Sequence, residues 1–233
     1  MKTIKVKSFE DLIEKIGEPK NRFYYIYRGQ SNSSWNLVPK LGRPPLWKYF
    51  SKPKNEKNIF ESWKRYGIQY FKNKPEDDWD WLALAQHHGL ATRLLDWSKN
   101  PLTALFFATY ENRKTEAALF SYRPQKIENP DTKDPFNIKK VLSFFPKGNS
   151  GRIVNQRGLF TISPNPNVPL EETDQGERMT KYLIDKKCIL DIKQKLDFFG
   201  INEFAIFPDL DGLSKYLNSY VNDILFEQNK TLY

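Results

Sequence analysis

The sequence predicts a single α+β domain, and three observations support this. The 233-residue chain is long enough for one sizeable domain, and aromatic residues make up 15% of it, enough to build a core although 28% of the residues are charged. Segments with helical and with strand-like periodicity alternate irregularly. No internal repeat, heptad run or low-complexity tract is visible. We therefore expect helices and strands that share one core.

Residues 8–17 predict a short amphipathic helix. Ser8 can cap its N-terminus, acidic residues occupy the first turn, and Gly17 can end it. Residues 1–19 are therefore expected as a helical lead-in to a domain that spans 20–233.

Residues 23–30 predict the first strand, because aromatic and β-branched side chains follow one another there. The strand runs into Arg28. An arginine in this position either lies on a solvated rim or points into a cleft, where its guanidinium can bind an anion through two hydrogen bonds. Periodicity alone favours the rim. Residues 31–58, rich in Ser, Asn, Pro and Lys, are expected to be mainly loop.

Three helices are expected in the middle of the chain. The first has an apolar stripe over 59–71, and the second begins near the acidic residues 76–78 and ends at Gly89. The third begins at Asn100 and Pro101, an N-cap residue followed by proline at the first helical position.

The second half of the chain alternates between strands, helices and two long polar segments. The polar segments 123–138 and 164–179 are expected as surface insertions. Strands are predicted at 117–122, 141–146, the end of 151–163, 181–190 and 202–208, and helices at 191–199 and 213–226. The strand at 202–208 would carry the carboxylate of Glu203 at its beginning.

The net charge of +9 favours phosphate-rich partners such as nucleic acid or nucleotides, although scattered lysines also serve solubility. One cysteine permits no intramolecular disulfide, which fits a reducing cytosol. No stretch approaches the roughly 18 apolar residues of a membrane span, and the N-terminus lacks the apolar segment of a signal peptide. A cytoplasmic protein without a membrane partner is expected.

The most polar part of the buried pattern lies between residues 81 and 98. His87 and His88 are adjacent, so on a helix they point about 100° apart and no metal site is expected from them. The motifs of serine hydrolases, P-loop proteins and dinucleotide-binding folds are absent. The polar residues that remain near strand ends are Arg28, Thr92, Arg93, Asp96, Ser98, Gln156 and Glu203.

A carboxylate together with an arginine suits a reaction that binds an anionic cofactor and stabilises a cationic transition state. Cleavage of the nicotinamide–ribose bond is one such reaction, because its transition state resembles an oxocarbenium ion. The structural alternative is an internal salt bridge, between Arg28 or Arg93 and Asp96 or Glu203, that only stabilises the fold.

Several motifs resemble the FRG domain family. They are Tyr27-Arg28-Gly29, the stretch Ala85 to Ser98 with Asn100-Pro101, Gln156 to Thr161, and Phe207 to Leu213. The resemblance covers about residues 20–220. The family implies no activity by itself, and the candidate residues His87, His88, Arg93 and Asp96 belong to this resemblance only.

A looser resemblance links the chain to arginine-type ADP-ribosyltransferases and implies their split β-sheet core flanked by helices. Tyr27-Arg28-Gly29 is similar to their first motif, and Glu203 to Pro208 is similar to their last. The resemblance implies that Arg28, with Gly29 and Gln30, binds NAD, that Glu203 stabilises the oxocarbenium ion, and that Ser98 or Thr92 shapes the nicotinamide pocket. Arg93 is a further candidate for cofactor binding, although it has no counterpart in the transferase pattern.

Two departures weaken transfer to a protein arginine. The Ser-Thr-Ser motif is absent, and Ile201 stands where such enzymes carry Glu or Gln.

The sequence therefore leaves three alternative hypotheses for the function. The first is an NAD-dependent ADP-ribosyltransferase or NAD glycohydrolase, acting as a toxin or phage-defence effector on a nucleic acid or protein acceptor, without metal, and subject to an inhibitory partner protein. It requires Arg28 and Glu203 to face one pocket. The second is a non-catalytic module that binds nucleotide or nucleic acid in a basic cleft. The third is a hydrolase or nuclease that pairs His87 or His88 with Glu203.

Overall fold

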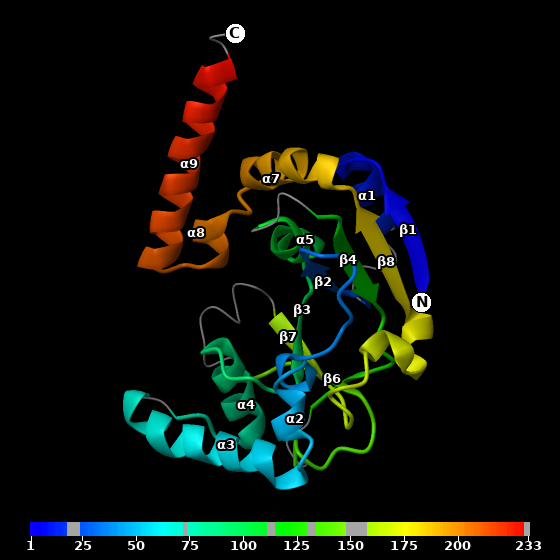
Figure 1. Ribbon diagram of the computed structural model, residues 1–233, viewed down its shortest axis with the longest axis vertical. Helices are drawn as coiled ribbons and strands as arrows, with labels where there is room; N and C mark the ends of the chain where they lie inside the picture. Colours follow the sequence, from blue (N-terminus) through cyan, green and yellow to red (C-terminus); the bar gives the residue numbers. More distant parts are fainter. Residues whose placement is uncertain (18–23, 72–73, 111–114, 130–133, 148–157, 231–233) are drawn as a thin grey trace.

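An eight-stranded mixed β-sheet forms the centre of the molecule, and helices pack against it (Figure 1). The computed structural model describes residues 1–17, 24–71, 74–110, 115–129, 134–147 and 158–230. Within these ranges the chain has the single α+β architecture that its sequence predicts.

The order of the strands in the sheet is β1-β8-β4-β2-β3-β7-β6-β5. The outer pairs β1·β8 and β5·β6 are parallel and the other neighbours are antiparallel. The strands are β1 (Lys2–Val6), β2 (Ile26–Gln30), β3 (Leu94–Ser98), β4 (Ala117–Tyr122), β5 (Ile127–Glu128), β6 (Leu142–Phe144), β7 (Gly158–Ile162) and β8 (Met179–Ile184).

The sheet is nearly divided in two between β2 and β3. These strands are joined by one residue pair, Tyr27 with Ser98, whereas β2 pairs with β4 over five residues and β3 pairs with β7 over five. Beyond Ser98 and Tyr27 the two strands lie unpaired on their facing sides. The backbone groups there need other partners or a ligand.

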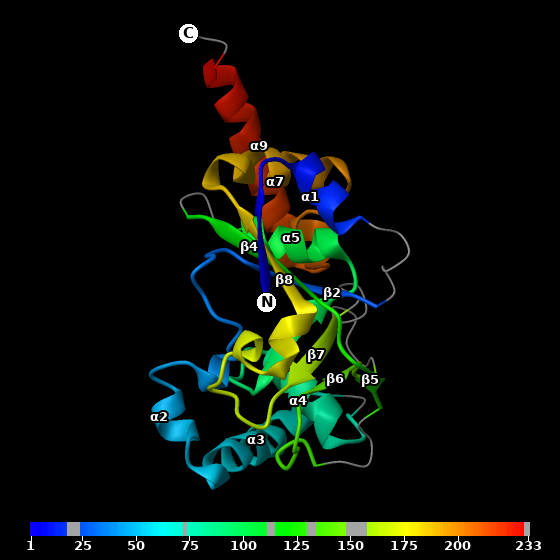
Figure 2. The same ribbon diagram turned by 90° about the vertical axis from the view of Figure 1, so that its right-hand side faces the viewer.

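Two groups of helices lie at opposite ends of the molecule. In both views α1, α5 and α7 gather near one end, α2, α3 and α4 gather near the other, and α9 extends away from the body (Figures 1 and 2). The α-helices are α1 (Phe9–Ile16), α2 (Trp47–Phe50), α3 (Pro53–Gly67), α4 (Asp78–His87), α5 (Pro101–Thr109), α7 (Ile189–Phe198), α8 (Glu203–Ile206) and α9 (Leu210–Lys230).

Each half of the sheet has its own helical cover. Tyr27 and Leu119 pack with residues of α5 and α7 in one cluster, whereas Leu94 and Phe160 pack with residues of α3 and α4 in another. A third cluster lies on the opposite face of the sheet and contains Trp97. The gap between α4 and α5 therefore lies over the division between β2 and β3.

Most predicted elements are confirmed. Ser8 caps α1 by accepting a hydrogen bond from the backbone of Asp11, and Asn100 caps α5 in the same way through Leu102. Gly89, with φ of +90°, follows the end of α4 where the chain turns. The strand at 117–122 lies in the middle of the sheet and is buried on both faces, which explains its uninterrupted apolar pattern.

Two expectations at the ends of the chain are wrong. Residues 2–6, assigned to a helical lead-in, form the edge strand β1. Residues 202–208 form no strand, because the Asn202 side chain accepts from the backbone N–H of Ala205 at 3.0 Å and starts the short helix α8. A short apolar run fits a strand or a buried helix equally well, and here the N-cap decides.

The predicted strand at 181–190 also ends early. Asp185 accepts a hydrogen bond from the backbone N–H of Lys187 at 2.8 Å, which turns the chain into a 3₁₀ helix at Lys186–Cys188 and then into α7. Among the described residues, no helix combines the length and the apolar character that crossing a bilayer requires.

Gly29 allows α5 to lie directly against β2. A Cβ atom at this position would lie 1.9 Å from the carbonyl oxygen of Ala104 and 2.6 Å from the backbone nitrogen of Ala108. Both obstacles are backbone atoms, so neither can move aside as a side chain could.

We expect Gly29→Ala to reduce the free energy of unfolding by about 3 kcal/mol or more, since overpacking against backbone must shift α5. Gly67→Ala is the matched control. Its new Cβ atom would meet only the Phe71 ring at 3.8 Å, and replacing a helical glycine should stabilise the protein by up to about 1 kcal/mol. Urea denaturation measures both. Similar values for the two variants would contradict the close contact between β2 and α5.

Candidate functional site

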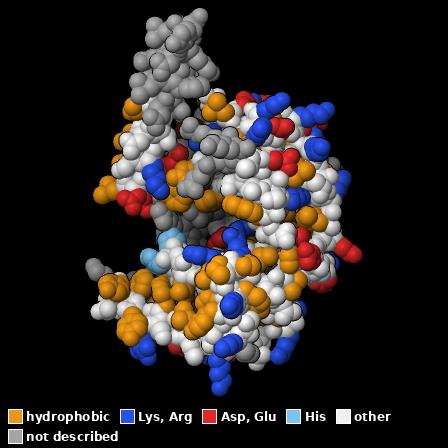
Figure 3. Space-filling model, viewed as in Figure 1, with side chains coloured by type: hydrophobic (Ala, Val, Ile, Leu, Met, Phe, Trp, Pro, Cys, Tyr) orange, Lys and Arg blue, Asp and Glu red, His pale blue; other side chains and the backbone are white. Residues whose placement is uncertain are grey.

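A cavity of about 430 Å³ opens where the sheet is divided. Its walls come from β2, β3, the end of α4, α5 and the loop after β2, and the surface is visibly hollowed there (Figure 3). Basic side chains lie inside this hollow and histidine lies at its side. The volume is typical of a site for a small molecule. The division of the sheet thus provides the space for a ligand.

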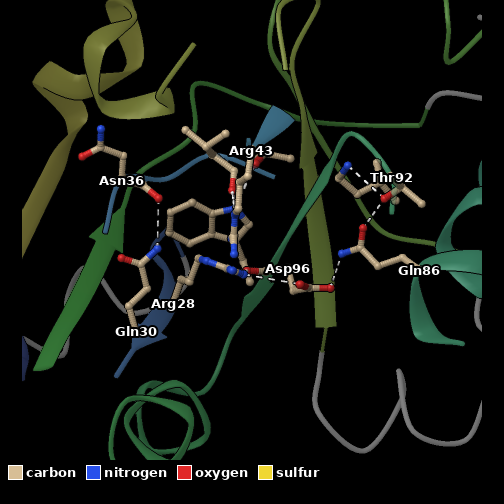
Figure 4. Close-up of polar contacts among 11 residues, drawn as sticks. Arg28, Gln30, Asn36, Arg43, Gln86, Thr92 and Asp96 are labelled. Atoms are coloured by element: carbon tan, nitrogen blue, oxygen red, sulfur yellow. Dashed lines mark hydrogen bonds and ion pairs between the residues drawn. The ribbon is translucent and has the colours of Figure 1, made fainter. Parts of the chain in front are cut away.

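Arg28 lies across the division between the strands (Figure 4). Its Nη1 atom donates to the backbone carbonyl of Asp96 at 2.7 Å and lies 3.4 Å from the Asp96 carboxylate. The arginine thereby satisfies a carbonyl group of β3 that β2 does not pair. Its Nε atom is buried and has no hydrogen-bond partner among the described residues. Arg28 therefore lines the cavity, held by its contact with Asp96, and does not lie on a solvated rim.

Asp96 is oriented by a chain of polar contacts. Gln86, in the last turn of α4, donates through Nε2 to Asp96 Oδ1 at 2.5 Å, and its carbonyl oxygen accepts from the Thr92 hydroxyl (Figure 4). Thr92 is almost fully buried. The Asp96 side chain nevertheless remains 61% exposed and lines the cavity. The result is an oriented and accessible carboxylate.

Arg43 brings a second guanidinium to the same cavity. Its Nε atom donates to the carbonyl of Val38 at 2.8 Å, which anchors the side chain. Partial removal from water and the nearby Arg28 lower the pKa of Arg43, while Asp96 acts in the opposite direction. Among the described lining residues, the two arginines and Asp96 carry the full charges, so positive charge exceeds negative by one.

Aromatic side chains form much of the remaining wall. They come from three parts of the chain: Trp35 after β2, Phe107 on α5 and Phe207 after α8. Trp35 and Phe107 are exposed to 51% and 36%, so each presents a free surface. Such surfaces can stack on a planar base.

Glu203 lies in a different place from Arg28. It is 7% exposed, accepts a hydrogen bond from the Ser219 hydroxyl at 3.4 Å and lines a separate cavity of about 60 Å³. The two cavities share no lining residue, and α5 stands between them. The expectation that Arg28 and Glu203 face one pocket is therefore wrong, because Glu203 lies in the short helix α8 and not in a strand of the sheet.

The two histidines differ in position. His87 lines the cavity. His88 packs with Trp63 and Phe71, with ring centroids 6.4 and 5.9 Å apart. This aromatic contact gives His88 a structural role. In the ranges that the structure describes, no three His, Cys, Asp or Glu side chains converge as a metal site requires.

Ser98 and Gly29 line the cavity as expected, and Ser98 also accepts from the backbone N–H of Asn100 at 3.0 Å. Arg93 does not line it. Its Nε atom donates to both oxygens of Glu56 at 2.8 and 2.9 Å, and Nη2 donates to the same carboxylate. Both side chains are about nine-tenths buried. Gln156 lies outside the described residues.

Arg43 and Gln86 are among the residues of the site that were not predicted from the sequence. Arg43 stands in a run of loop-forming residues, Gly42-Arg43-Pro44-Pro45, and Gln86 stands in an otherwise apolar helix. The family resemblance included Gln86, but nothing in the local pattern distinguishes a glutamine that contacts a site from one on a solvated face.

Breaking the Arg93–Glu56 pair tests its structural role. We expect Glu56→Gln to lower the free energy of unfolding by about 3 kcal/mol, because it leaves a buried guanidinium without its countercharge. Glu61→Gln is the control, since that carboxylate is half exposed and lies 3.6 Å from Lys64, and it should cost under about 0.5 kcal/mol. Thermal and urea denaturation compare them. If Glu56→Gln left the stability unchanged but impaired ligand binding, Arg93 would be assigned to the ligand-binding site and not to a structural ion pair.

One comparison with known protein families matches part of the chain. The searches of curated proteins and of solved structures gave no match, so they add no support to the resemblance to ADP-ribosyltransferases. The segment from β2 to the start of β4 contains Arg28, Arg43, Gln86 and Asp96, and ends before Glu203. This segment, residues 24–117, matches the family model of the FRG domain.

Proposed function

We propose that the cavity between α4 and α5 binds a phosphorylated nucleoside, and that NAD is the first ligand to test. The observation that carries this proposal is the convergence of Arg28 and Arg43 on one cavity, whose described lining residues include a single carboxylate. Partial removal from water is the main cause of the lowered pKa of Arg43, and repulsion by the Arg28 guanidinium adds to it. A phosphate between them would replace repulsion by paired, charge-assisted hydrogen bonds.

The remaining wall suits the other parts of such a ligand. The half-exposed indole of Trp35 and the ring of Phe107 offer stacking surfaces for a base. A non-catalytic nucleotide-binding module needs no more than this.

Cleavage of the nicotinamide–ribose bond of NAD is a second candidate, favoured by the carboxylate of Asp96. Asp96 lies in the same cavity as Arg28, is held by Gln86 and remains accessible. A carboxylate beside the ribose would stabilise the oxocarbenium-like transition state. Under this proposal Asp96 takes the role expected of Glu203, which lines another cavity. An ADP-ribose acceptor, nucleic acid or protein, and a toxin or defence role belong to the same proposal and draw on the net charge of +9.

The binding proposal predicts that Arg43→Gln weakens NAD binding about 10- to 100-fold, the effect of removing one hydrogen-bonded charge. Lys48→Gln on α2 makes the same change in net charge at an exposed position outside the cavity and should alter the affinity less than twofold. Calorimetric titration at one fixed salt concentration measures both. Equal weakening by the two variants would indicate non-specific attraction to the basic surface.

The cleavage proposal predicts that wild type releases nicotinamide from NAD and that Asp96→Asn is slower by about 10²- to 10³-fold, the usual effect of removing one group that stabilises transition-state charge. Glu203→Gln should retain activity within about threefold. Chromatographic detection of nicotinamide, with DNA, RNA and protein acceptors present, provides the measurement.

The opposite order of the two variants would restore Glu203 as the catalytic carboxylate. NAD binding without nicotinamide release by wild type would assign the cavity a binding role only.

A further inference from the structure

Positive charge is concentrated in one segment of the chain. Residues 40–71, which contain α2 and α3, include eight Lys and Arg and two acidic residues. This seventh of the chain therefore holds a net charge of +6, out of +9 for the whole sequence. A local excess of this kind attracts polyanions at long range.

The carboxylates in and beside this segment are engaged by other groups. Glu56 is buried against Arg93. One lysine, Lys64, lies 3.6 Å from Glu61 and 2.6 Å from Asp78 at the start of α4. These carboxylates therefore leave other cations of the segment without a countercharge.

Four exposed cations in this segment have no carboxylate partner within the part of the chain that the structure describes. Lys48 lies on α2, Lys52 and Lys54 lie at the start of α3, and Arg65 lies in its last turn. The start of a helix is the positive end of its dipole, where a cation is unfavourable. The charge of Lys52 and Lys54 thus gives the fold no stability, which points to an anionic partner outside the chain.

Exposed aromatic rings accompany these cations. Tyr49 on α2, Tyr66 on α3 and Tyr70 in the 3₁₀ helix that follows are each more than half exposed. The Arg65 guanidinium lies 5.1 Å from the centre of the Tyr66 ring, so charge and ring lie side by side. Figure 3 shows hydrophobic and basic side chains together on the part of the molecule below the hollow, the end that holds α2 and α3 in Figure 1.

Cations and rings together select one kind of polyanion. Lysines contact the phosphates of any nucleic acid, whereas aromatic side chains stack only on bases that are unpaired and accessible. The 15 residues of α3 span about 22 Å, a length over which a strand presents several phosphates. The combination therefore fits a single strand better than a duplex.

We propose that the surface formed by residues 47–70, here called the α2–α3 surface, binds single-stranded nucleic acid. The exposed cations contact its phosphates, and the tyrosines stack on its bases. Lys48, Lys52, Lys54 and the three tyrosines do not line the cavity. The inference therefore goes beyond the proposed function and does not depend on a nucleotide in the cavity.

The first test is titration by fluorescence anisotropy with labelled RNA and DNA strands of about 20 nucleotides, and with the matching duplexes, between about 50 and 200 mM salt. We expect wild type to bind the single strands about tenfold or more tightly than the duplexes, because only unpaired bases can stack on the tyrosines. Affinity should fall steeply as the salt concentration rises.

Lys52→Gln combined with Lys54→Gln tests the cations. Each lost phosphate contact should reduce the slope of log affinity against log salt concentration by about 0.7, so this pair should reduce it by up to about 1.4. Lys186→Gln with Lys187→Gln makes the same change in net charge at exposed positions before α7 and should leave the slope unchanged. Both pairs should bind NAD within about twofold of wild type, since none of these lysines lines the cavity.

Tyr66→Leu combined with Tyr70→Leu tests the rings. Leucine cannot stack on a base, so the affinity for single strands should fall about tenfold or more while the affinity for duplexes changes less than about twofold. Phe198→Leu removes an exposed ring on α7, at the other end of the molecule, and should change neither affinity.

No binding of single strands by wild type, or equal affinity for strands and duplexes, would overturn the inference. Equal effects of the two lysine pairs would also overturn it, because they would indicate attraction to the net charge and not to the α2–α3 surface. Failure of wild type to bind NAD would remove the proposed function of the cavity and leave this inference standing. The comparison of strands with duplexes needs no variant, so it decides the question even if a substitution impairs folding.

Discussion

The single residue pair between β2 and β3 is the constraint on which the rest of this structure depends. A sheet of eight strands would ordinarily satisfy its backbone through continuous ladders. Here the ladder between Tyr27 and Ser98 stops after one pair, and the Arg28 guanidinium bonds to the Asp96 carbonyl that the ladder leaves free. The arginine thus holds the two halves of the sheet together across the opening that forms the cavity.

The helices follow from the same division. α5 packs closely on β2 because Gly29 has no side chain, and α4 packs on the other half through Leu94 and Phe160. Each helix covers its own half, so neither covers the opening. The end of α4 instead delivers Gln86 to Asp96, and α5 delivers Phe107 to the wall. The site is therefore the place where two independently covered half-sheets meet.

Charge and hydrogen bonding in the cavity are both incomplete without a ligand. Two arginines face one aspartate, and two buried polar atoms, Arg28 Nε and Gln30 Oε1, lack partners among the described residues. Imbalance of this kind is unfavourable for a fold and is expected where a protein binds something. The excess of positive charge supports the proposed binding of an anion. The buried Arg93–Glu56 pair is different, because each group there satisfies the other.

Local sequence was sufficient for much of the fold. The caps at Ser8 and Asn100, the turn at Gly89 and the apolar run of β4 depend on neighbouring residues, and the structure contains them as predicted. The sequence also identified Arg28 and Asp96 as candidate site residues, through the family motifs that hold them. Residues 2–6 and 202–208 were assigned wrongly, because short segments take their state from contacts that lie outside them.

Which residues share a cavity was decided by the tertiary structure alone. The sequence determined that the chain is one α+β domain with an FRG-type segment, since periodicity, capping and motif order are properties of neighbouring residues. It could not show that Arg43 and Gln86 line the same cavity as Arg28, or that Arg93 forms an ion pair with Glu56. Nor could it show that α5 separates Glu203 from the site. Those relations join residues 15 to 175 positions apart, and only the packing of the sheet and its helices brings them together or keeps them apart.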